Sequence, residues 1–171
     1  MRASPIRRKG AASFEDLKPA CQVLILHEDF SAYSRAVEVC RRVMERFASE
    51  LDFDVKCWNF IELADPNCAR HAAKTAGGAD IILLAMHTTE MPLELDRWVD
   101  FYFIDRFRAE GVLALVLNPA ATSPLAGEKL RLRLQQLTAR LGMDFIPLPP
   151  EHDAMVLDAL TPSIVARPAP E

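Results

Sequence analysis

An apolar segment in the middle of the chain, residues 79–86, constrains the fold more than any other feature. It shows no alternation of apolar and polar residues, and it stops abruptly in a polar run at residues 87–90. A strand of this kind has both faces covered, which is typical of the centre of a parallel sheet. Open α/β sheets bind ligands beside the carboxyl ends of their strands. We therefore expect any ligand of this chain to lie near residues 87–90.

Strand-like apolar segments alternate with amphipathic helical segments along the rest of the chain. We expect strands at residues 22–26, 53–60, 79–86, 112–117 and 143–148. We expect helices at residues 32–49, 66–77, 92–108 and 125–141, and a brief helix at 153–160. This order predicts one α/β domain over residues 20–160, a three-layer α/β/α structure with a five-stranded parallel sheet. The alternating segment 53–60 fits a place nearer a sheet edge.

The two ends of the chain differ in composition from this domain. The first ten residues carry four basic side chains and no acid, so we expect residues 1–19 to form a flexible basic arm and residues 161–171 a loose tail. The remaining residues carry 16 basic against 24 acidic side chains, which argues against nucleic-acid binding by the folded domain. The sequence shows neither a secretory signal nor a membrane span, so we expect a cytoplasmic protein without membrane contact.

The four cysteines are widely spaced and form no C-x-x-C pair, which excludes a zinc knuckle and a thioredoxin motif. We expect free, mostly buried thiols at Cys21, Cys40, Cys57 and Cys68.

Short motifs within residues 21–160 resemble the receiver domains of bacterial two-component response regulators, which belong to the flavodoxin-like group. The pair Glu28-Asp29 resembles the metal-binding acidic pair of that family, and residues 80–85 resemble its third strand. The Met-Pro at residues 91–92 and the segment 144–149 resemble motifs that follow in receivers. The resemblance implies the strand order 2-1-3-4-5 and a role in signalling.

The chain departs from receivers at the residues that carry their chemistry. Ala85 stands where the resemblance implies the phosphorylated aspartate, and Leu148 stands where it implies the active-site lysine. A methyl group cannot attack a phosphoryl donor, and an isobutyl group cannot pair with a phosphate. We therefore expect no phosphorylation. A minor alternative is that Asp29 accepts the phosphoryl group instead. The loop at residues 27–33 has no glycine and two carboxylates, so we expect no FMN, NAD, ATP or other cofactor there.

Polar side chains follow three of the expected strands, and neighbouring strands would bring them to one edge of the sheet. The candidates for ligand or metal binding are His27, Glu28, Asp29, His87, Thr88, Glu90 and Asn118. Of these, His27, Asp29 and His87 could ligate a divalent metal or act as acid and base. The alternative is that Asp29 and Ser31 cap the first helix, Glu28 is solvated and the histidines are ordinary surface groups.

The helix expected at residues 92–108 is rich in aromatic residues, which cannot all face the sheet. With Leu95, Val99, Tyr102 and Phe103 inward, we expect Trp98, Phe101 and Ile104 to point outward and to form a homodimer interface. The alternative is that neighbouring helices or the basic arm cover them.

Two classes of function are compatible with these features. The first is a non-catalytic regulatory or protein-interaction domain, receiver-like but not phosphorylated, acting as an oligomer with itself or with an unknown protein partner. The second is a metal-binding or small-ligand-binding enzyme that uses His27, Asp29 and His87 at the carboxyl edge of the sheet.

Overall fold

A five-stranded parallel sheet forms the centre of the molecule. The structure is a computed structural model, and it describes residues 18–106, 110–117, 124–148 and 161–162. The strands lie in the order β2-β1-β3-β4-β5 and all neighbouring pairs are parallel. Their bounds are β1 (Ala20–His27), β2 (Asp52–Asn59), β3 (Ile81–Met86), β4 (Val112–Leu117) and β5 (Asp144–Leu148).

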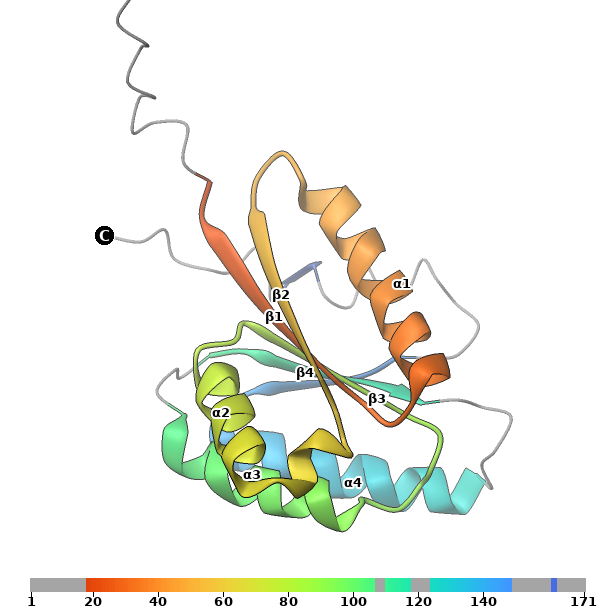
Figure 1. The fold of residues 1–171 in the computed structure, drawn as a ribbon. Helices are drawn as coiled ribbons and strands as arrows, with labels where there is room; N and C mark the ends of the chain where they lie inside the picture. Colours follow the sequence, from red (N-terminus) through yellow and green to blue (C-terminus); the bar gives the residue numbers. More distant parts are fainter. Residues whose placement is uncertain (1–17, 107–109, 118–123, 149–160, 163–171) are drawn as a thin grey trace, which may run out of the picture.

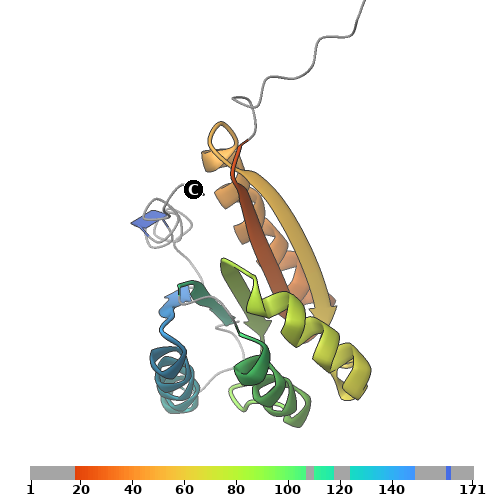
Figure 2. The same ribbon diagram turned by 90° about the vertical axis from the view of Figure 1, so that its left-hand side faces the viewer.

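Helices cover both faces of this sheet. In the described part of the chain they are α1 (Phe30–Phe47), the short 3-10 helix η2 (Glu62–Ala64), α2 (Pro66–Gly77), α3 (Leu93–Asp105) and α4 (Pro124–Leu141). Helix α1 lies on one face, whereas α2, α3 and α4 lie on the other (Figures 1 and 2). This three-layer arrangement and the strand order are those of the flavodoxin-like group, so the predicted fold class is confirmed.

The central apolar segment forms β3, between β1 and β4, as predicted. All six of its residues are buried, and their side chains alternate between two apolar clusters. Ile82, Leu84 and Met86 pack with α2, α3 and α4, whereas the other three residues of β3 face α1. Both faces of the strand are therefore covered, as its lack of alternation requires.

The helix ends follow local sequence signals. Asp65 caps α2 by accepting a hydrogen bond from the Asn67 N–H, and Pro66 occupies the first turn. Gly142, just after α4, has the left-handed φ of 68° that favours glycine at a helix end. Helix α1 begins two residues earlier than expected because Asp29, not Ser31, caps it.

Some predictions fall on residues that are not described. These are residues 1–17 of the basic arm, the brief helix at 153–160, Asn118 and residues 163–171 of the tail. The first two residues of the tail, 161 and 162, are described and are helical. In the described part of the chain, no helix is both long enough and apolar enough to cross a membrane.

Candidate functional site

The carboxyl ends of β1 and β3 bring two polar loops together. His27 of β1 is level with Ala85 of β3, and the Glu28 N–H donates a hydrogen bond of 3.0 Å to the Ala85 carbonyl. The loop after β1 therefore lies directly beside the loop after β3. The predicted proximity of Glu28 and Asp29 to His87 and Thr88 is borne out by direct contacts between them.

The Glu28 carboxylate links these two loops. Its Oε2 accepts hydrogen bonds from the His87 N–H at 2.6 Å and from the Thr88 N–H at 3.1 Å. Hydrogen bonds to an ionised acceptor are shorter and stronger than those between neutral groups. Glu28 is therefore not simply solvated: it fixes the start of the β3–α3 loop against the end of β1.

Asp29 makes two contacts with one carboxylate oxygen. Its Oδ1 accepts a hydrogen bond of 2.8 Å from the Ala32 N–H, which caps α1, and lies 3.0 Å from Nε2 of His87. The Ala32 N–H is the main cause that lowers the pKa of the Asp29 carboxyl from its ordinary value, and His87 adds to this effect. Asp29 therefore joins helix capping to the His87 contact.

His27 makes different contacts from this pair. Its Nδ1 lies 3.2 Å from the main-chain oxygen of Asp29, and its ring centroid lies 5.0 Å from that of Tyr33. Among the residues that the structure describes, no group of three or more His, Cys, Asp or Glu side chains could hold a metal ion. Of the three predicted metal ligands, the structure thus brings the side chains of Asp29 and His87 together and leaves His27 apart.

The remaining candidates contribute less to the edge. The Thr88 hydroxyl donates a hydrogen bond of 3.3 Å to the Glu90 carbonyl, and Glu90 itself is exposed. Asn118 lies outside the described residues. A contact that the sequence did not indicate comes from Arg35, whose Nη2 donates to the Leu117 carbonyl at 3.1 Å. Burial lowers the pKa of this guanidinium, and its hydrogen bond ties α1 to the end of β4.

Ala85 and Leu148 lie in the apolar cluster under α1. Ala85 is fully buried and Leu148 is 4% exposed. Neither side chain has a polar atom that could accept or bind a phosphoryl group. Chemically, the edge offers one imidazole–carboxylate pair that can orient a ligand or transfer a proton.

The prediction that Trp98 points outward from α3 was wrong. Trp98 is 2% exposed, and its ring stacks on that of Tyr102 with centroids 5.0 Å apart. The buried stripe of the helix follows steps of three, one and three residues and consists of Leu95, Trp98, Val99 and Tyr102. Phe103, which we had placed in that stripe, is only partly buried.

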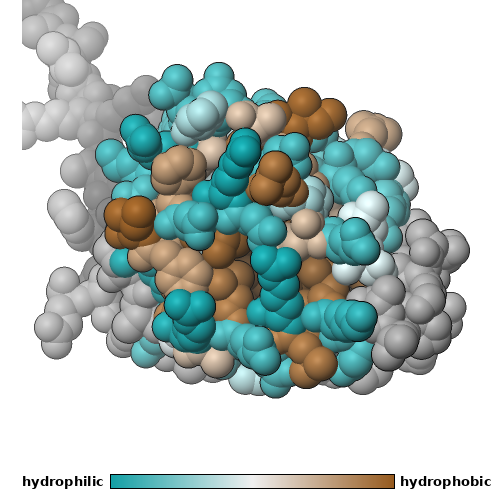
Figure 3. All heavy atoms as spheres, turned by 90° about the horizontal axis from the view of Figure 1, so that it is seen from below, coloured by the Kyte–Doolittle hydropathy of each residue, from teal (hydrophilic) through white to brown (hydrophobic). Residues whose placement is uncertain are grey.

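Arginines from the neighbouring helices cover the other aromatics of α3. Arg70 of α2 lies 5.3 Å from the Phe101 ring centroid, and Arg140 of α4 lies 5.0 Å from that of Phe103. Ile104 is 80% exposed. Figure 3 shows this face as largely hydrophilic, with apolar residues in separate patches. The homodimer itself remains a prediction, without Trp98 as a contact.

Comparison with known proteins identifies no family. No family model matches the chain, and no curated protein matches it. Among solved structures, it is similar to a short-chain flavodoxin associated with a non-canonical PDU bacterial microcompartment. The TM-score is 0.49 at 13% sequence identity, over 86% of this chain and 97% of the flavodoxin. Function must therefore be inferred from the residues of this chain.

Proposed function

We propose that the chain is a non-catalytic regulatory or protein-interaction domain of the cytoplasm, receiver-like in architecture, that is not phosphorylated and acts as an oligomer. One observation carries the proposal: the acidic pair at the carboxyl edge is engaged by the chain itself. Glu28 accepts two loop N–H groups, and Asp29 accepts the α1 cap and contacts His87.

Magnesium prefers carboxylate oxygens and water as ligands, with near-ideal octahedral geometry. An ion at this edge would compete with the two loop N–H groups for the Glu28 oxygen and with the Ala32 N–H for the Asp29 oxygen. The position that matches the phosphorylated residue holds the buried methyl group of Ala85. Binding of the metal ion that phosphoryl transfer requires is therefore disfavoured, and the side chain at residue 85 cannot accept a phosphoryl group.

Acetyl phosphate and magnesium provide the test. After incubation with them, intact-mass spectrometry should show no added phosphoryl group, and magnesium with beryllofluoride should leave the melting temperature unchanged. An active receiver domain treated in parallel shows that the reagents work. A phosphorylated product that disappears in Asp29→Asn would contradict the proposal.

The contact between Asp29 and His87 favours a second candidate, a metal-binding or small-ligand-binding enzyme at the same edge. Zinc titration of chelator-treated protein distinguishes the two. Under the leading proposal, zinc shifts the melting temperature of the wild type and of His27→Ala/His87→Ala equally. A stabilisation confined to the wild type would favour the second candidate.

A further inference from the structure

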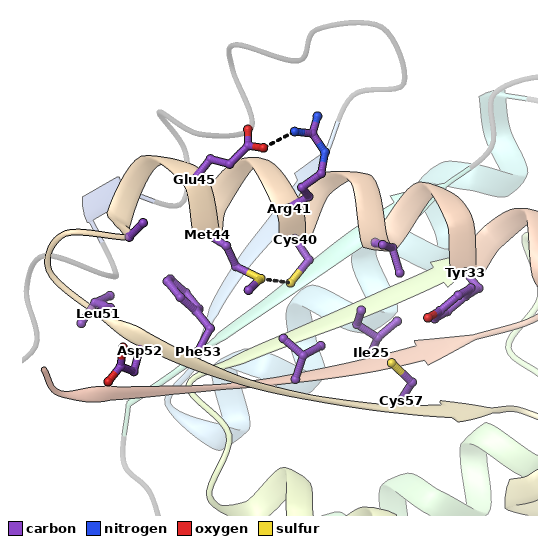
Figure 4. A pocket seen from close by; sticks show the side chains of 13 residues that line it. Ile25, Tyr33, Cys40, Arg41, Met44, Glu45, Leu51, Asp52, Phe53 and Cys57 are labelled. Carbon is purple, nitrogen blue, oxygen red and sulfur yellow. Dashed lines mark hydrogen bonds and ion pairs between the residues drawn. The ribbon is translucent and has the colours of Figure 1, made fainter.

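Strand β2 lies at one edge of the five-stranded sheet. Among the described residues, β2 pairs with β1 alone. A groove of about 760 Å³ lies between β2 and α1 (Figure 4). Phe53, Val55 and Cys57 of β2 line it, and Met44 extends toward it from α1. This part of the molecule thus combines an unpaired strand edge with a partly covered apolar surface.

Two hydrogen bonds at the ends of β2 show which backbone groups face outward. The Asp52 N–H donates to the Pro19 carbonyl, and the Phe60 N–H donates to the His27 carbonyl. Even-numbered residues of the strand therefore direct their backbone groups toward β1. The direction of the backbone groups alternates along a strand. The N–H and C=O groups of Phe53, Val55 and Cys57 therefore point away from β1, in the plane of the sheet.

We propose that a second copy of this chain pairs with the open edge of β2 in antiparallel fashion, about a two-fold axis through Val55. Each residue then lies opposite the residue of the second copy that is the same number of positions from Val55 in the other direction along the sequence. The odd-numbered residues exchange backbone hydrogen bonds, and the even-numbered residues form the non-hydrogen-bonded pairs, whose side chains lie closer together. The two sheets become one continuous sheet of ten strands.

The charges on β2 are complementary under this symmetry. Asp54 lies opposite Lys56 of the second copy, and Lys56 lies opposite Asp54 of the second copy. Within one chain these two side chains are already 3.5 Å apart, and each is about half exposed. Two copies would therefore bring four charges of alternating sign together, and opposite charges across strands stabilise a sheet.

The apolar side chains match under the same symmetry. Val55 lies opposite Val55 of the second copy, and Phe53 lies opposite its Cys57. These residues are on the α1 face of β2, where Phe53 and Val55 pack against the apolar cluster under α1. A two-fold axis normal to the sheet keeps both α1 helices on this face. The grooves of the two copies would then lie side by side on this face, above one continuous apolar surface formed by the two β2 strands.

Charged residues on an edge strand often prevent pairing. That protection is strongest when like charges meet, whereas the sequence of β2 places unlike charges opposite each other. The inference rests on the proposed function in one respect, because it names the surface through which the oligomer forms. It does not depend on the absence of phosphorylation.

Sedimentation velocity over a range of concentrations tests the pairing with three variants. Asp54→Lys places only lysines across the axis, and Lys56→Asp places only aspartates there. Each should weaken self-association about tenfold or more, because two favourable pairs become repulsive. Asp54→Lys/Lys56→Asp restores opposite charges and should associate as the wild type does. Mixing the two single variants should give a heterodimer.

The outcomes separate the possible failures. A wild type that remains monomeric at high micromolar concentration overturns both this inference and the oligomeric part of the proposed function. A wild-type dimer that the single variants leave intact overturns this surface alone. Weakened single variants without recovery in the double variant overturn the pairing about Val55. Melting temperatures close to wild type verify that the variants fold, as expected for half-exposed side chains.

Discussion

The carboxyl edge of the sheet and the open edge of β2 differ in how their polar groups are used. At the carboxyl edge, Glu28 and Asp29 accept hydrogen bonds from the loops and from α1. At β2, alternate backbone groups point outward, and the apolar residues beside them line a groove. The first region is stabilised within the chain, whereas no strand among the described residues pairs with the outer side of the second.

The carboxyl edge shows that a position where related folds bind ligands can serve another purpose in a particular chain. Flavodoxin-like sheets place ligands beside the carboxyl ends of their strands, and this chain does gather its polar residues there. Their hydrogen bonds nevertheless hold the strand ends and loops in place. The contacts of particular side chains, and not the fold, determine how this edge is used.

The largest expected effect comes from placing a receiver-like aspartate in the buried strand. Ala85→Asp should lower the free energy of unfolding by about 3 to 5 kcal/mol, because Ala85 is fully buried among apolar residues. Ala64→Asp, the same change at an exposed position, should cost less than about 1 kcal/mol. Urea unfolding measures both variants. Equal stability of the two would show that the edge tolerates an acceptor at residue 85.

A smaller loss is expected when the α1 cap is removed. Asp29→Ala should cost about 1 kcal/mol near neutral pH, whereas Ser31→Ala should be within about 0.5 kcal/mol of wild type. The pKa of the Asp29 carboxyl is lowered from 3.8 on folding, chiefly by the Ala32 N–H. Its contribution is therefore fully present above pH 3.8 and is lost as the pH falls through the lower folded value. A difference between wild type and Asp29→Ala that does not change with pH would contradict this assignment.

The smallest effect is expected at the thiols of the groove. Burial raises the pKa of the Cys40 thiol to about 11 and also raises the pKa of the Cys57 thiol, but Cys57 is exposed whereas Cys40 is buried. In dilute, monomeric protein a maleimide should modify Cys57 well before Cys40, and its attachment should change the free energy of unfolding of the monomer by less than about 0.5 kcal/mol. Peptide mapping by mass spectrometry identifies the modified residue. Equal rates at the two cysteines would show that the groove is not open as described.

Much of the fold could be predicted because its signals are local. The unbroken apolar run of β3, the Asp65-Pro66 start of α2 and Gly142 after α4 each act within a few residues. Trp98 was misplaced because the apolar residues of α3 fit two overlapping faces, and the choice between them depends on how α3 packs against α2 and the sheet.

The site could be predicted in part. Parallel strands end at the same edge, which was enough to bring Asp29 and His87 together. The role of Glu28 could not be derived, because it depends on the torsions of the side chain and on the path of the next loop. The groove beside β2 depends on where α1 crosses the sheet, and no local pattern sets that position.

The Glu28 carboxylate holds the loop after β3 against the end of β1, and amide hydrogen exchange at its two donors measures this contact. The His87 and Thr88 amides, followed by NMR, should be protected in the wild type and in Glu90→Ala, a change at an exposed residue of the same loop. In Glu28→Ala the protection of these two amides should be lost, while the amides of β3 remain protected. Rapid exchange of both amides in the wild type, or protection that persists in Glu28→Ala, would show that Glu28 does not hold this loop.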